Sequence, residues 1–468
     1  MFIGRQNELE LLNELHSSKR FEFLVLYGRR RVGKTSLLKE FSTRSSTVFF
    51  SAQEKNDALN LIDFSRTVQK YFEGKDFGSF ESWEKAFDYI GLKASGKNKV
   101  TIIIDEFPFI AAENPSIKSI LQHTVDHSWK NKNIFLILCG SSVSFMENDV
   151  MGYKSPLYGR STSQLELLPF DYLDSAEFFR NYSSEEKLAA YGILGGIPCY
   201  LQTFDPERSI KENIAKNILR TGAFLTEEPQ SLLKMELRDP AVYNSIFEAI
   251  ANGASRMNDI TQKIHEEPSK CSKYLKTLID LKLISRNTPC GEEESSRKTL
   301  YSISDNFFAF WFRYLFTEKS YYELIGAEDA AREITDPDSF NNYMRLIFEK
   351  ICCQYMKRLA KQKKLPFIPH KMGKWWGTNS KLKRQDDCDI LLLSRDNRKA
   401  VFCECKYKNS PLDKKEFDAI CATADNFSGI TEKYFYFFSK GGFTEWIREK
   451  AENEKNIFLV EPDDLFNV

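Results

Sequence analysis

The stretch FLVLYGRRRVGKTSLL, residues 23–38, reads as an apolar strand, a loop between two glycines and the start of a helix. The loop from Gly28 to Thr35 fits the spacing G-x-x-x-x-G-K-[ST]. Its glycines allow the backbone to curl so that successive N–H groups point at phosphate oxygens, and the helix adds its positive N-terminal end. A chance glycine loop would not need the flanking strand and helix, so the stretch predicts a phosphate-binding loop.

The residue types at the end of this loop indicate how phosphates and a metal ion would be held. Lys34 supplies a point charge for the β- and γ-phosphates, and Thr35 supplies a hydroxyl ligand for Mg²⁺. The predicted nucleotide-binding residues are Gly28, Arg29, Arg30, Arg31, Val32, Gly33, Lys34, Thr35, Ser36 and, from a later segment, Ser141.

A second apolar run places two acids where they could serve this loop. Residues 99–104, KVTIII, are β-branched enough to predict a strand buried on both faces, and Asp105 and Glu106 follow it. A carboxylate at the carboxyl end of such a strand lies beside the phosphate loop. We expect Asp105 to hold Mg²⁺, directly or through water, and Glu106 to polarise the attacking water. The alternative is an ordinary strand end with two solvated acids.

Two further segments carry polar groups that could reach the γ-phosphate. Residues 134–139 predict a third strand, and Ser141 or Ser142 after it could contact the phosphate or the attacking water. The alternative is a serine-rich turn. Arg160 could act as an arginine finger, within its own chain or from a neighbour, or it could be a solvated arginine.

Length, charge and cysteine content limit the class of protein. A chain of 468 residues suggests about three domains. Its formal net charge of +0 gives no argument for nucleic-acid binding by the molecule as a whole, so any such binding must come from local patches. The N-terminus lacks a signal-peptide pattern, and the apolar runs are too short to cross a bilayer. Ten cysteines without a disulfide framework or zinc-ligand spacing fit a reducing cytoplasm, where we expect the protein to be.

The middle of the chain predicts a winged helix-turn-helix. The expected helices are residues 242–251, 257–264 and 269–281, and the expected strands are residues 282–288 and 299–304. Lys270, Lys273 and Lys276 recur on one side of the third helix, which in this motif usually lies in the DNA major groove. The alternative is a module that packs on its neighbours or mediates oligomers, with the lysines as a solvated face. The acids at residues 292–294 would repel phosphates.

The C-terminal third has its own alternation of helices and strands. Asp389, Glu404 and Lys406 form a D-x₁₄-E-x-K pattern, with Asp389 expected to start a strand next to the one that carries Glu404 and Lys406 on one face. Two carboxylates could hold Mg²⁺ while the lysine orients or activates water, and Glu349 could complete the site. The alternative is an amphipathic strand with an incidental salt bridge. The basic stretch at residues 371–384, with Trp375 and Trp376, suits phosphate contact and base stacking or a partner-binding loop.

Five of these motifs, in order, resemble the archaeal-type ATPases of the AAA/STAND branch of P-loop NTPases. They are GRRRVGKTSLL, IIIDEFPFI, CGSSVSFM, SPLYGR with LPF, and GGIPCYL. The resemblance implies ATP hydrolysis and a helical lid that brings Pro198 near the nucleotide. The family often has a second arginine after SPLYGR, where this chain has Ser161.

The C-terminal pattern resembles the PD-(D/E)XK nuclease superfamily, and more closely the nuclease-like domain commonly fused to archaeal-type ATPases. In that domain Trp375-Trp376 and the triplet that ends in Asp389 recur, although the proline of the superfamily name is missing here. The predicted catalytic residues are Lys34, Glu106, Arg160, Asp389, Glu404 and Lys406, and the predicted metal ligands are Thr35, Asp105, Glu349, Asp389 and Glu404.

Together these patterns predict an α/β protein of four parts. They are a P-loop NTPase core (residues 1–170), a helical lid (171–238), a winged helix (239–320) and an α/β restriction-endonuclease-like domain (338–468). We expect a protein that binds ATP and Mg²⁺ and couples hydrolysis to nucleic-acid binding or cleavage, with DNA favoured over RNA and no membrane. The rival hypothesis is a signalling ATPase whose C-terminal parts only bind DNA or a protein partner. A homo-oligomer and a transcription regulator stay open.

Overall fold

The computed structural model describes residues 2–94, 96, 98–293, 298–379 and 383–467. Glu294 of the acidic run and residues 380–382 of the basic stretch therefore lie outside the described residues. The chain divides into two compact units. Unit 1 is Met1–Pro169 with Ile197–Cys199, and unit 2 is Phe170–Gly196 with Tyr200–Val468. In the described part of the chain, no helix combines the length and apolar character that crossing a membrane requires.

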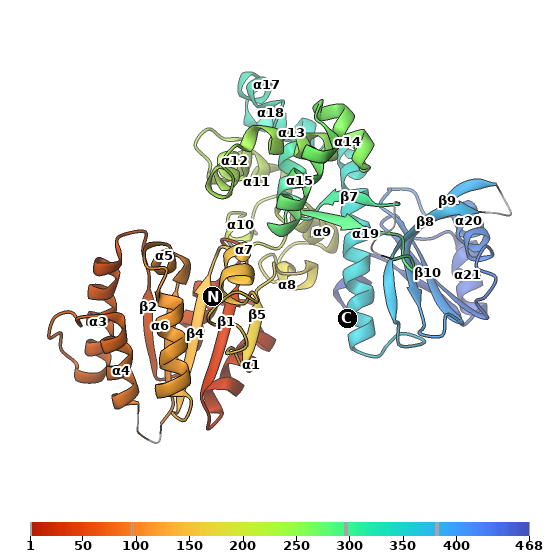
Figure 1. The fold of residues 1–468 in the computed structure, drawn as a ribbon. Coiled ribbons are helices and arrows are strands. Elements are labelled where there is room, and N and C mark those ends of the chain that lie inside the picture. The colour runs from red at the N-terminus through yellow and green to blue at the C-terminus, as the bar shows by residue number, and fades with distance from the viewer. Residues whose placement is uncertain (1, 95, 97, 294–297, 380–382, 468) are drawn as a thin grey trace. The chain divides into compact units, whose positions relative to one another are not determined.

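Unit 1 is built on a parallel five-stranded sheet in the order β2-β3-β4-β1-β5 (Figure 1). The strands are β1 (Glu22–Tyr27), β2 (Thr47–Ser51), β3 (Val100–Asp105), β4 (Ile134–Gly140) and β5 (Ser163–Glu166). Every residue of β3 and β4 is buried, as their β-branched and apolar composition predicts for strands covered on both faces. The predicted parallel α/β core is confirmed, and β3 extends one residue further than predicted, so that Asp105 belongs to the strand.

Helices cover both faces of this sheet. They are α1 (Gln6–Ser17), α2 (Lys34–Ser42), α3 (Asp57–Glu73), α4 (Trp83–Lys93), α5 (Phe107–Glu113), α6 (Ile117–Thr124), η1 (Val125–Trp129), α7 (Val143–Phe145) and η2 (Met146–Val150). On one face, Phe64 of α3 packs edge-to-face on Phe50 of β2 within the large aromatic core. On the other, Phe41 of α2 packs on Phe135 of β4. Both contacts follow from the alternation of side chains along each strand.

The first part of unit 2 is helical. Its helices are α8 (Tyr172–Ala176), α9 (Ser184–Leu194), α11 (Ile210–Ile214), η3 (Ala215–Leu219), α12 (Phe224–Glu236), α16 (Asn306–Tyr314), α17 (Lys319–Ile325) and α18 (Ala327–Ile334). The aromatic helix α16 is buried. Phe308 and Phe312 pack on Phe247, and the indole N–H of Trp311 donates to the carbonyl of Thr226 at 2.8 Å. Burial of so many rings explains why this helix carries few polar residues.

Three helices and a two-stranded ribbon follow one another within unit 2. They are α13 (Pro240–Ala251), α14 (Met257–Ile264), α15 (Pro268–Asp280), β6 (Ile284–Asn287) and β7 (Leu300–Ile303). The two strands pair in antiparallel register, from Ile284 opposite Ile303 to Asn287 opposite Leu300. We call this set the three-helix–ribbon module, and we call residues 288–293, which leave β6, the ribbon connection.

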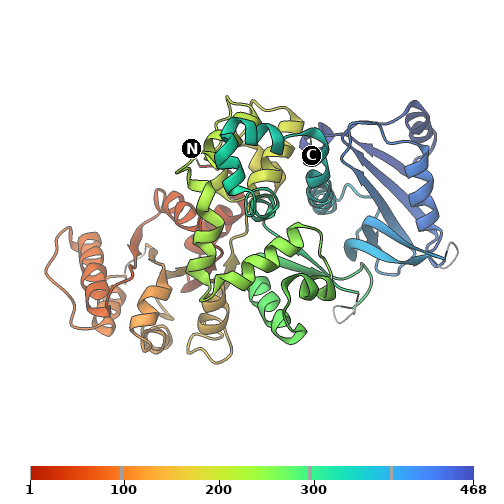
Figure 2. The ribbon, with the colours of Figure 1, turned by 90° about the horizontal axis from the view of Figure 1, so that it is seen from above.

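The C-terminal part of unit 2 is a mixed five-stranded sheet in the order β12-β11-β10-β9-β8 (Figure 2). Its strands are β8 (Lys371–Asn379), β9 (Arg384–Leu393), β10 (Lys399–Lys406), β11 (Glu432–Ser439) and β12 (Ile457–Val460), followed by the short helix η4 (Asp464–Phe466). The helix α19 (Pro337–Lys361) packs on one face, and α20 (Lys414–Ala424) and α21 (Glu445–Asn453) pack on the other.

Two sequence expectations for this sheet are wrong. The first half of the basic stretch forms the edge strand β8 and is not a loop. Asp389 lies inside β9 and does not begin it, because the polar residues before it already pair with β8, with Gln385 opposite Thr378 and Asp386 opposite Gly377. Pairing partners at a sheet edge can recruit polar sequence into a strand that apolar periodicity alone does not reveal.

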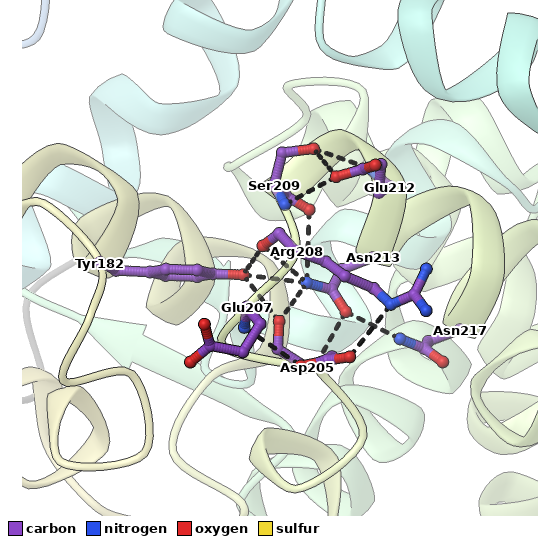
Figure 3. Close-up of polar contacts among 8 residues, drawn as sticks. All are labelled: Tyr182, Asp205, Glu207, Arg208, Ser209, Glu212, Asn213 and Asn217. Atoms are coloured by element: carbon purple, nitrogen blue, oxygen red, sulfur yellow. Dashed lines mark hydrogen bonds and ion pairs between the residues drawn. The ribbon is translucent and has the colours of Figure 1, made fainter.

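A network of polar contacts around Asn213 fixes the loop before α11 (Figure 3). The buried Asn213 amide group lies within hydrogen-bonding distance of the Tyr182 hydroxyl (2.9 Å) and the carbonyls of Asp205 (2.8 Å) and Arg208 (3.2 Å). Its oxygen accepts from the Asp205 N–H at 2.8 Å and from the Asn217 amide at 2.9 Å. One buried side chain thus bonds to several backbone groups of this loop.

We expect Asn213→Ala to lower the free energy of unfolding by about 2 kcal/mol, because it removes the several hydrogen bonds that this buried amide makes to the loop. The control is Asn217→Ala, which removes a single half-buried contact and should have a smaller effect. Urea unfolding followed by tryptophan fluorescence measures both. Wild-type stability of Asn213→Ala would contradict the role given to the network.

Candidate functional site

The phosphate loop connects β1 to α2 and has the conformation that its glycines allow. Gly28 has a φ of 152°, and a Cβ there would lie 2.4 Å from the carbonyl oxygen of Leu167, so no other residue fits. Gly33, with a φ of 97°, precedes the first residue of α2. The ammonium group of Lys34 donates to the carbonyls of Gly28 (2.8 Å) and Arg29 (3.0 Å), inside the curve of the loop. Burial lowers the pKa of Lys34. The lysine is thus placed where the phosphates of a nucleotide would need a positive charge.

The loop is held from outside by Arg5, whose role the sequence analysis missed. The guanidinium group of Arg5 donates to the carbonyl of Val32 at 3.1 Å and to that of Leu168 at 2.7 Å, and it pairs with Glu8 at 3.1 Å. Arg5 itself has a φ of 65°, a conformation that non-glycine residues adopt infrequently. An arginine directly before an amphipathic helix was the only available signal, and alone it does not specify this contact.

Asp105 and Thr35 meet across the end of the sheet. The Thr35 hydroxyl donates to Oδ2 of Asp105 at 2.8 Å, although β4 lies between β1 and β3 in the sheet. Asp105 is 1% exposed, so its carboxylate depends on these protein contacts. A threonine hydroxyl and a carboxylate supply the hard oxygen atoms that Mg²⁺ prefers, and the two groups fit such an ion beside a nucleotide.

Glu106 is directed to a different partner from that of its neighbour. Its carboxylate accepts from the hydroxyl of Ser141 at 2.8 Å and from the backbone N–H of the same residue at 3.3 Å. Glu106 has a φ of 53°, which is strained backbone of the kind that clusters at functional sites. Of these two adjacent acids, Asp105 therefore faces Thr35, and Glu106 is oriented by Ser141. Of the two serines considered from the sequence, the structure places Ser141 at the site.

Arg160 is engaged in an ion pair within unit 1. Its guanidinium group donates to both carboxylate oxygens of Asp126 at 2.7–3.0 Å and to the carbonyls of Pro156 and Tyr158. Arg160 lowers the pKa of Asp126 through this hydrogen bond. A role as an arginine finger would require Arg160 to leave Asp126, and it stays a prediction.

The segment around Pro198 lies against the phosphate loop and continues on both sides into unit 2. A Cβ at Gly33 would lie 3.7 Å from Cγ of Pro198, which places this proline against the loop within unit 1. On either side of residues 197–199 the chain belongs to unit 2, where Gly195 lies against Asn306 and the ring of Tyr200 packs on Phe307. The short helix α10 (Pro198–Leu201) therefore begins in one unit and ends in the other.

A second cluster of charged side chains lies in the C-terminal sheet of unit 2. Glu404 and Lys406 on β10 form an ion pair. Lys374 on β8 donates to Glu349 on α19 at 2.7 Å and to Asp389 on β9 at 3.2 Å. The second oxygen of Asp389 accepts from the N–H of Cys405 at 2.9 Å. We call these five side chains, Glu349, Lys374, Asp389, Glu404 and Lys406, the C-terminal centre.

The positive charges near the carboxylates of this centre only partly offset the cost of burying them. Burial, followed by the charge of Asp389, raises the pKa of Glu349 and of Glu404, although a lysine opposes the rise in each case. Burial lowers the pKa of Lys374, but Glu349 and Asp389 more than offset this, so that its pKa is raised. The two lysines therefore stay charged and only partly compensate the buried acids.

The C-terminal centre does not fit a divalent metal ion in this arrangement. Each of its carboxylates is paired with an ammonium group. In the part of the chain that the structure describes, no three or more His, Cys, Asp or Glu side chains form a group that could hold a metal ion. The predicted acids are brought together, but Lys374, which the sequence motif does not contain, stands between two of them. Trp375 packs edge-to-face on Phe427, in the apolar cluster beneath the sheet.

Two segments of the chain match known protein families. Residues 2–204 match a family model described as an ATPase domain predominantly from Archaea, and residues 311–420 match one described as archaeal and bacterial proteins of unknown function. An uncharacterized protein of Methanocaldococcus jannaschii is 37% identical over 409 residues, which cover 87% of this chain and 88% of that protein. An uncharacterized ATP-binding protein of the same organism is 49% identical over 41 residues, or 9% of this chain and 70% of its own length.

A Walker-type ATPase of Pyrococcus abyssi has a similar structure. Its TM-score is 0.51 with 20% sequence identity, over 67% of this chain and 96% of that one. This likeness shows a shared fold, and the family model over residues 2–204 identifies an ATPase domain in the first part of the chain.

The raised pKa of Glu349 predicts how stability depends on pH. A folded-state pKa above the ordinary value of about 4.3 means that the folded protein binds more protons than the unfolded chain, so this group favours folding at low pH. Its contribution is lost as pH rises through the raised pKa. Relative to wild type, Glu349→Gln should therefore become more stable by about 1–2 kcal/mol between pH 5 and pH 8.

Urea unfolding at several pH values measures this difference, with the exposed Glu445→Gln as the control that should show no trend. A stability difference for Glu349→Gln that is independent of pH would mean that the carboxylate is ionised across the whole range.

Proposed function

This chain belongs to the same family as the uncharacterized Methanocaldococcus jannaschii protein, and its residues 2–204 match an archaeal ATPase domain. From these premises we propose that it hydrolyses ATP and uses the energy to change how unit 2 engages DNA. The observation that supports ATP hydrolysis is the hydrogen bond between Thr35 and Asp105, made at the end of the loop that holds Lys34. This arrangement brings a phosphate-binding loop, a metal-ligand pair and a positive charge together.

The roles of the residues follow from their contacts. Lys34 would exchange its bonds to the carbonyls of Gly28 and Arg29 for bonds to the β- and γ-phosphates. Thr35 and Asp105 would hold Mg²⁺, which supplies charge neutralisation on those phosphates when it is bound. Glu106 would accept a proton from, or orient, the attacking water, and Ser141 would keep its carboxylate in position.

Pro198 supports a connection between nucleotide state and unit 2. It lies against Gly33 of the phosphate loop, and two residues later Tyr200 is fixed in unit 2 by its hydroxyl, which donates to the buried Glu228 at 2.8 Å. A displacement of the loop by bound nucleotide would therefore act on a short covalent segment with ordered neighbours at both ends.

The three-helix–ribbon module supports the choice of DNA as a partner. We interpret it as a winged helix in which α15 presents Lys270, Lys273 and Lys276, all exposed, at intervals of three residues. Lysines in this spacing lie along one side of a helix, where they can contact successive phosphates. The ribbon connection contains Glu292 and Glu293, so it is α15 and not the ribbon that suits a nucleic acid.

In the arrangement present, the C-terminal centre supports a binding role rather than phosphodiester cleavage. The motif D-x₁₄-E-x-K is assembled in space, but each of its carboxylates is paired with a lysine. A module that binds DNA or a protein partner needs no metal ion there. This favours the second hypothesis from the sequence, an ATPase whose C-terminal part binds without cutting.

We expect Lys34→Ala to weaken ATP binding at least tenfold and to abolish hydrolysis, because the buried ammonium is the charge nearest the phosphates. Glu106→Gln should keep ATP binding and lower the rate of hydrolysis about 100-fold or more, since it removes only the group that acts on water. Calorimetry and phosphate release measure the two effects.

Lys39→Ala provides the matched control, because Lys39 is an exposed lysine on the same helix. Normal ATP turnover by Lys34→Ala would contradict the proposed site.

Replacing Lys270, Lys273 and Lys276 by glutamine should weaken binding to duplex DNA and reduce the slope of log affinity against log salt by about 2–3, because up to three phosphate contacts are lost. Fluorescence anisotropy over a salt series measures both. The control replaces the exposed lysines Lys361, Lys363 and Lys364 in the same way. Equal affinities for the two triple variants would exclude α15 as the contact.

A further inference from the structure

Lys374 occupies a position at which the C-terminal centre concentrates negative charge. Its ammonium lies 2.7 Å from Oε2 of Glu349, 3.2 Å from Oδ1 of Asp389 and 3.8 Å from Oδ2 of Asp387. The side chains of Glu349 and Asp389 are 15% and 9% exposed, so they can exchange these contacts for water only to a small extent. A second cation could not enter between the two carboxylates without displacing this one, because like charges at such distances repel strongly.

The pairing of β8 with β9 is irregular at the residue that carries this ammonium. Gly373 pairs with Leu391 and Trp375 pairs with Cys388, so two steps along β8 correspond to three along β9. The additional residue is in β9, so Asp389 lies in the bulged stretch opposite Lys374, and the Lys374 ammonium reaches its carboxylate there. Bulges commonly redirect a side chain next to a functional site.

The ribbon connection is attached at the same residue. The N–H of Cys290 donates to the carbonyl of Lys374 at 2.8 Å, and its thiol donates to the carbonyl of Leu391 at 3.3 Å. Lys371 on the same strand donates to the carbonyl of Gly291 at 3.3 Å. The two segments lie in van der Waals range at Gly373, where a Cβ would lie 3.8 Å from that of Cys290. The ribbon strand β7 and the sheet strands β8 and β9 lie near one another in Figure 1.

A second contact joins the three-helix–ribbon module to α19, the helix that carries Glu349. Lys350, which follows Glu349 on α19, donates to the carbonyl of Ile303 at the end of β7 at 2.7 Å. Burial lowers the pKa of Lys350 to about 8. The three-helix–ribbon module thus contacts both elements that hold the Lys374–Glu349 pair.

We propose, on the basis of the function given above, that Lys374 is a built-in cation that keeps the C-terminal centre closed to divalent metal ions, and that the ribbon connection holds it there. A displacement of the three-helix–ribbon module, as when α15 engages DNA, would release the backbone of Lys374 and withdraw its ammonium. The centre would then present Glu349 and Asp389, the two carboxylates that Lys374 joins, to a divalent cation. The contact is an autoinhibitory one, and the module that binds DNA controls it.

The test is Mn²⁺ binding by the full chain without nucleotide, followed by the EPR signal of free Mn²⁺. Wild type should bind weakly, and Lys374→Met should bind about tenfold more tightly or better, because the competing charge is gone. Adding Asp389→Asn to Lys374→Met should remove the gain. The control Lys399→Met makes the same change of charge on β10, where Lys399 pairs with Glu432, and should bind like wild type.

The role of the ribbon connection is tested by a matched pair at one position. Cys290→Pro removes the N–H that donates to Lys374, whereas Cys290→Ala keeps it and loses only the thiol. Cys290→Pro should bind Mn²⁺ more tightly than Cys290→Ala. Equal binding by this pair would overturn the role of the ribbon connection.

Equal Mn²⁺ affinity for wild type and Lys374→Met, or a gain that survives Asp389→Asn, would overturn the proposal as a whole. If circular dichroism shows that Lys374→Met is unfolded, Lys374→Gln, which keeps a polar partner for the carboxylates, replaces it. ATP hydrolysis is measured in parallel. The rate of ATP hydrolysis should be normal in all these variants. If wild type does not hydrolyse ATP, the proposed ATPase activity is wrong, and the Mn²⁺ affinities alone decide the role of Lys374.

Discussion

The hydrogen bond between Thr35 and Asp105 connects two segments that are 70 residues apart in the chain and two positions apart in the sheet. It can form only if β1, β4 and β3 end at the same edge, which parallel strands do. The same edge aligns Ser141 with Glu106, so the order of the strands sets the distances in the nucleotide site. Arg5 then holds the backbone of the loop from the other side. The geometry of this site therefore depends on strand order as well as on the individual residues.

In unit 2 the electrostatic constraint is different, because several carboxylates are largely buried in the C-terminal sheet. Two ammonium groups, from the strands on either side of β9, supply most of the compensation, and the raised pKa of Glu349 and Glu404 indicates that it is incomplete. A buried ion pair is a weak source of stability but a strong constraint on geometry. The arrangement therefore fits a centre whose state changes when one charge moves.

Much of this could be predicted from the sequence, because the deciding signals are local. The phosphate loop, the β-branched strand before Asp105 and the serine after β4 all depend on short patterns and on the rule that parallel strands end together. The contacts of Arg5 and Lys374 could not be predicted, because each depends on a carbonyl or a carboxylate that is distant in sequence. The strand β8 was missed for the same reason: its polar residues form a strand only because β9 pairs with them.

Unit 1 is not a continuous piece of chain, since Ile197–Cys199 return to it after an excursion through unit 2. A polypeptide that ends at Pro169 would lack the proline that lies against Gly33. During synthesis, the phosphate loop therefore acquires its last neighbour only after about 30 further residues have emerged, which couples maturation of the nucleotide site to the appearance of α8 and α9.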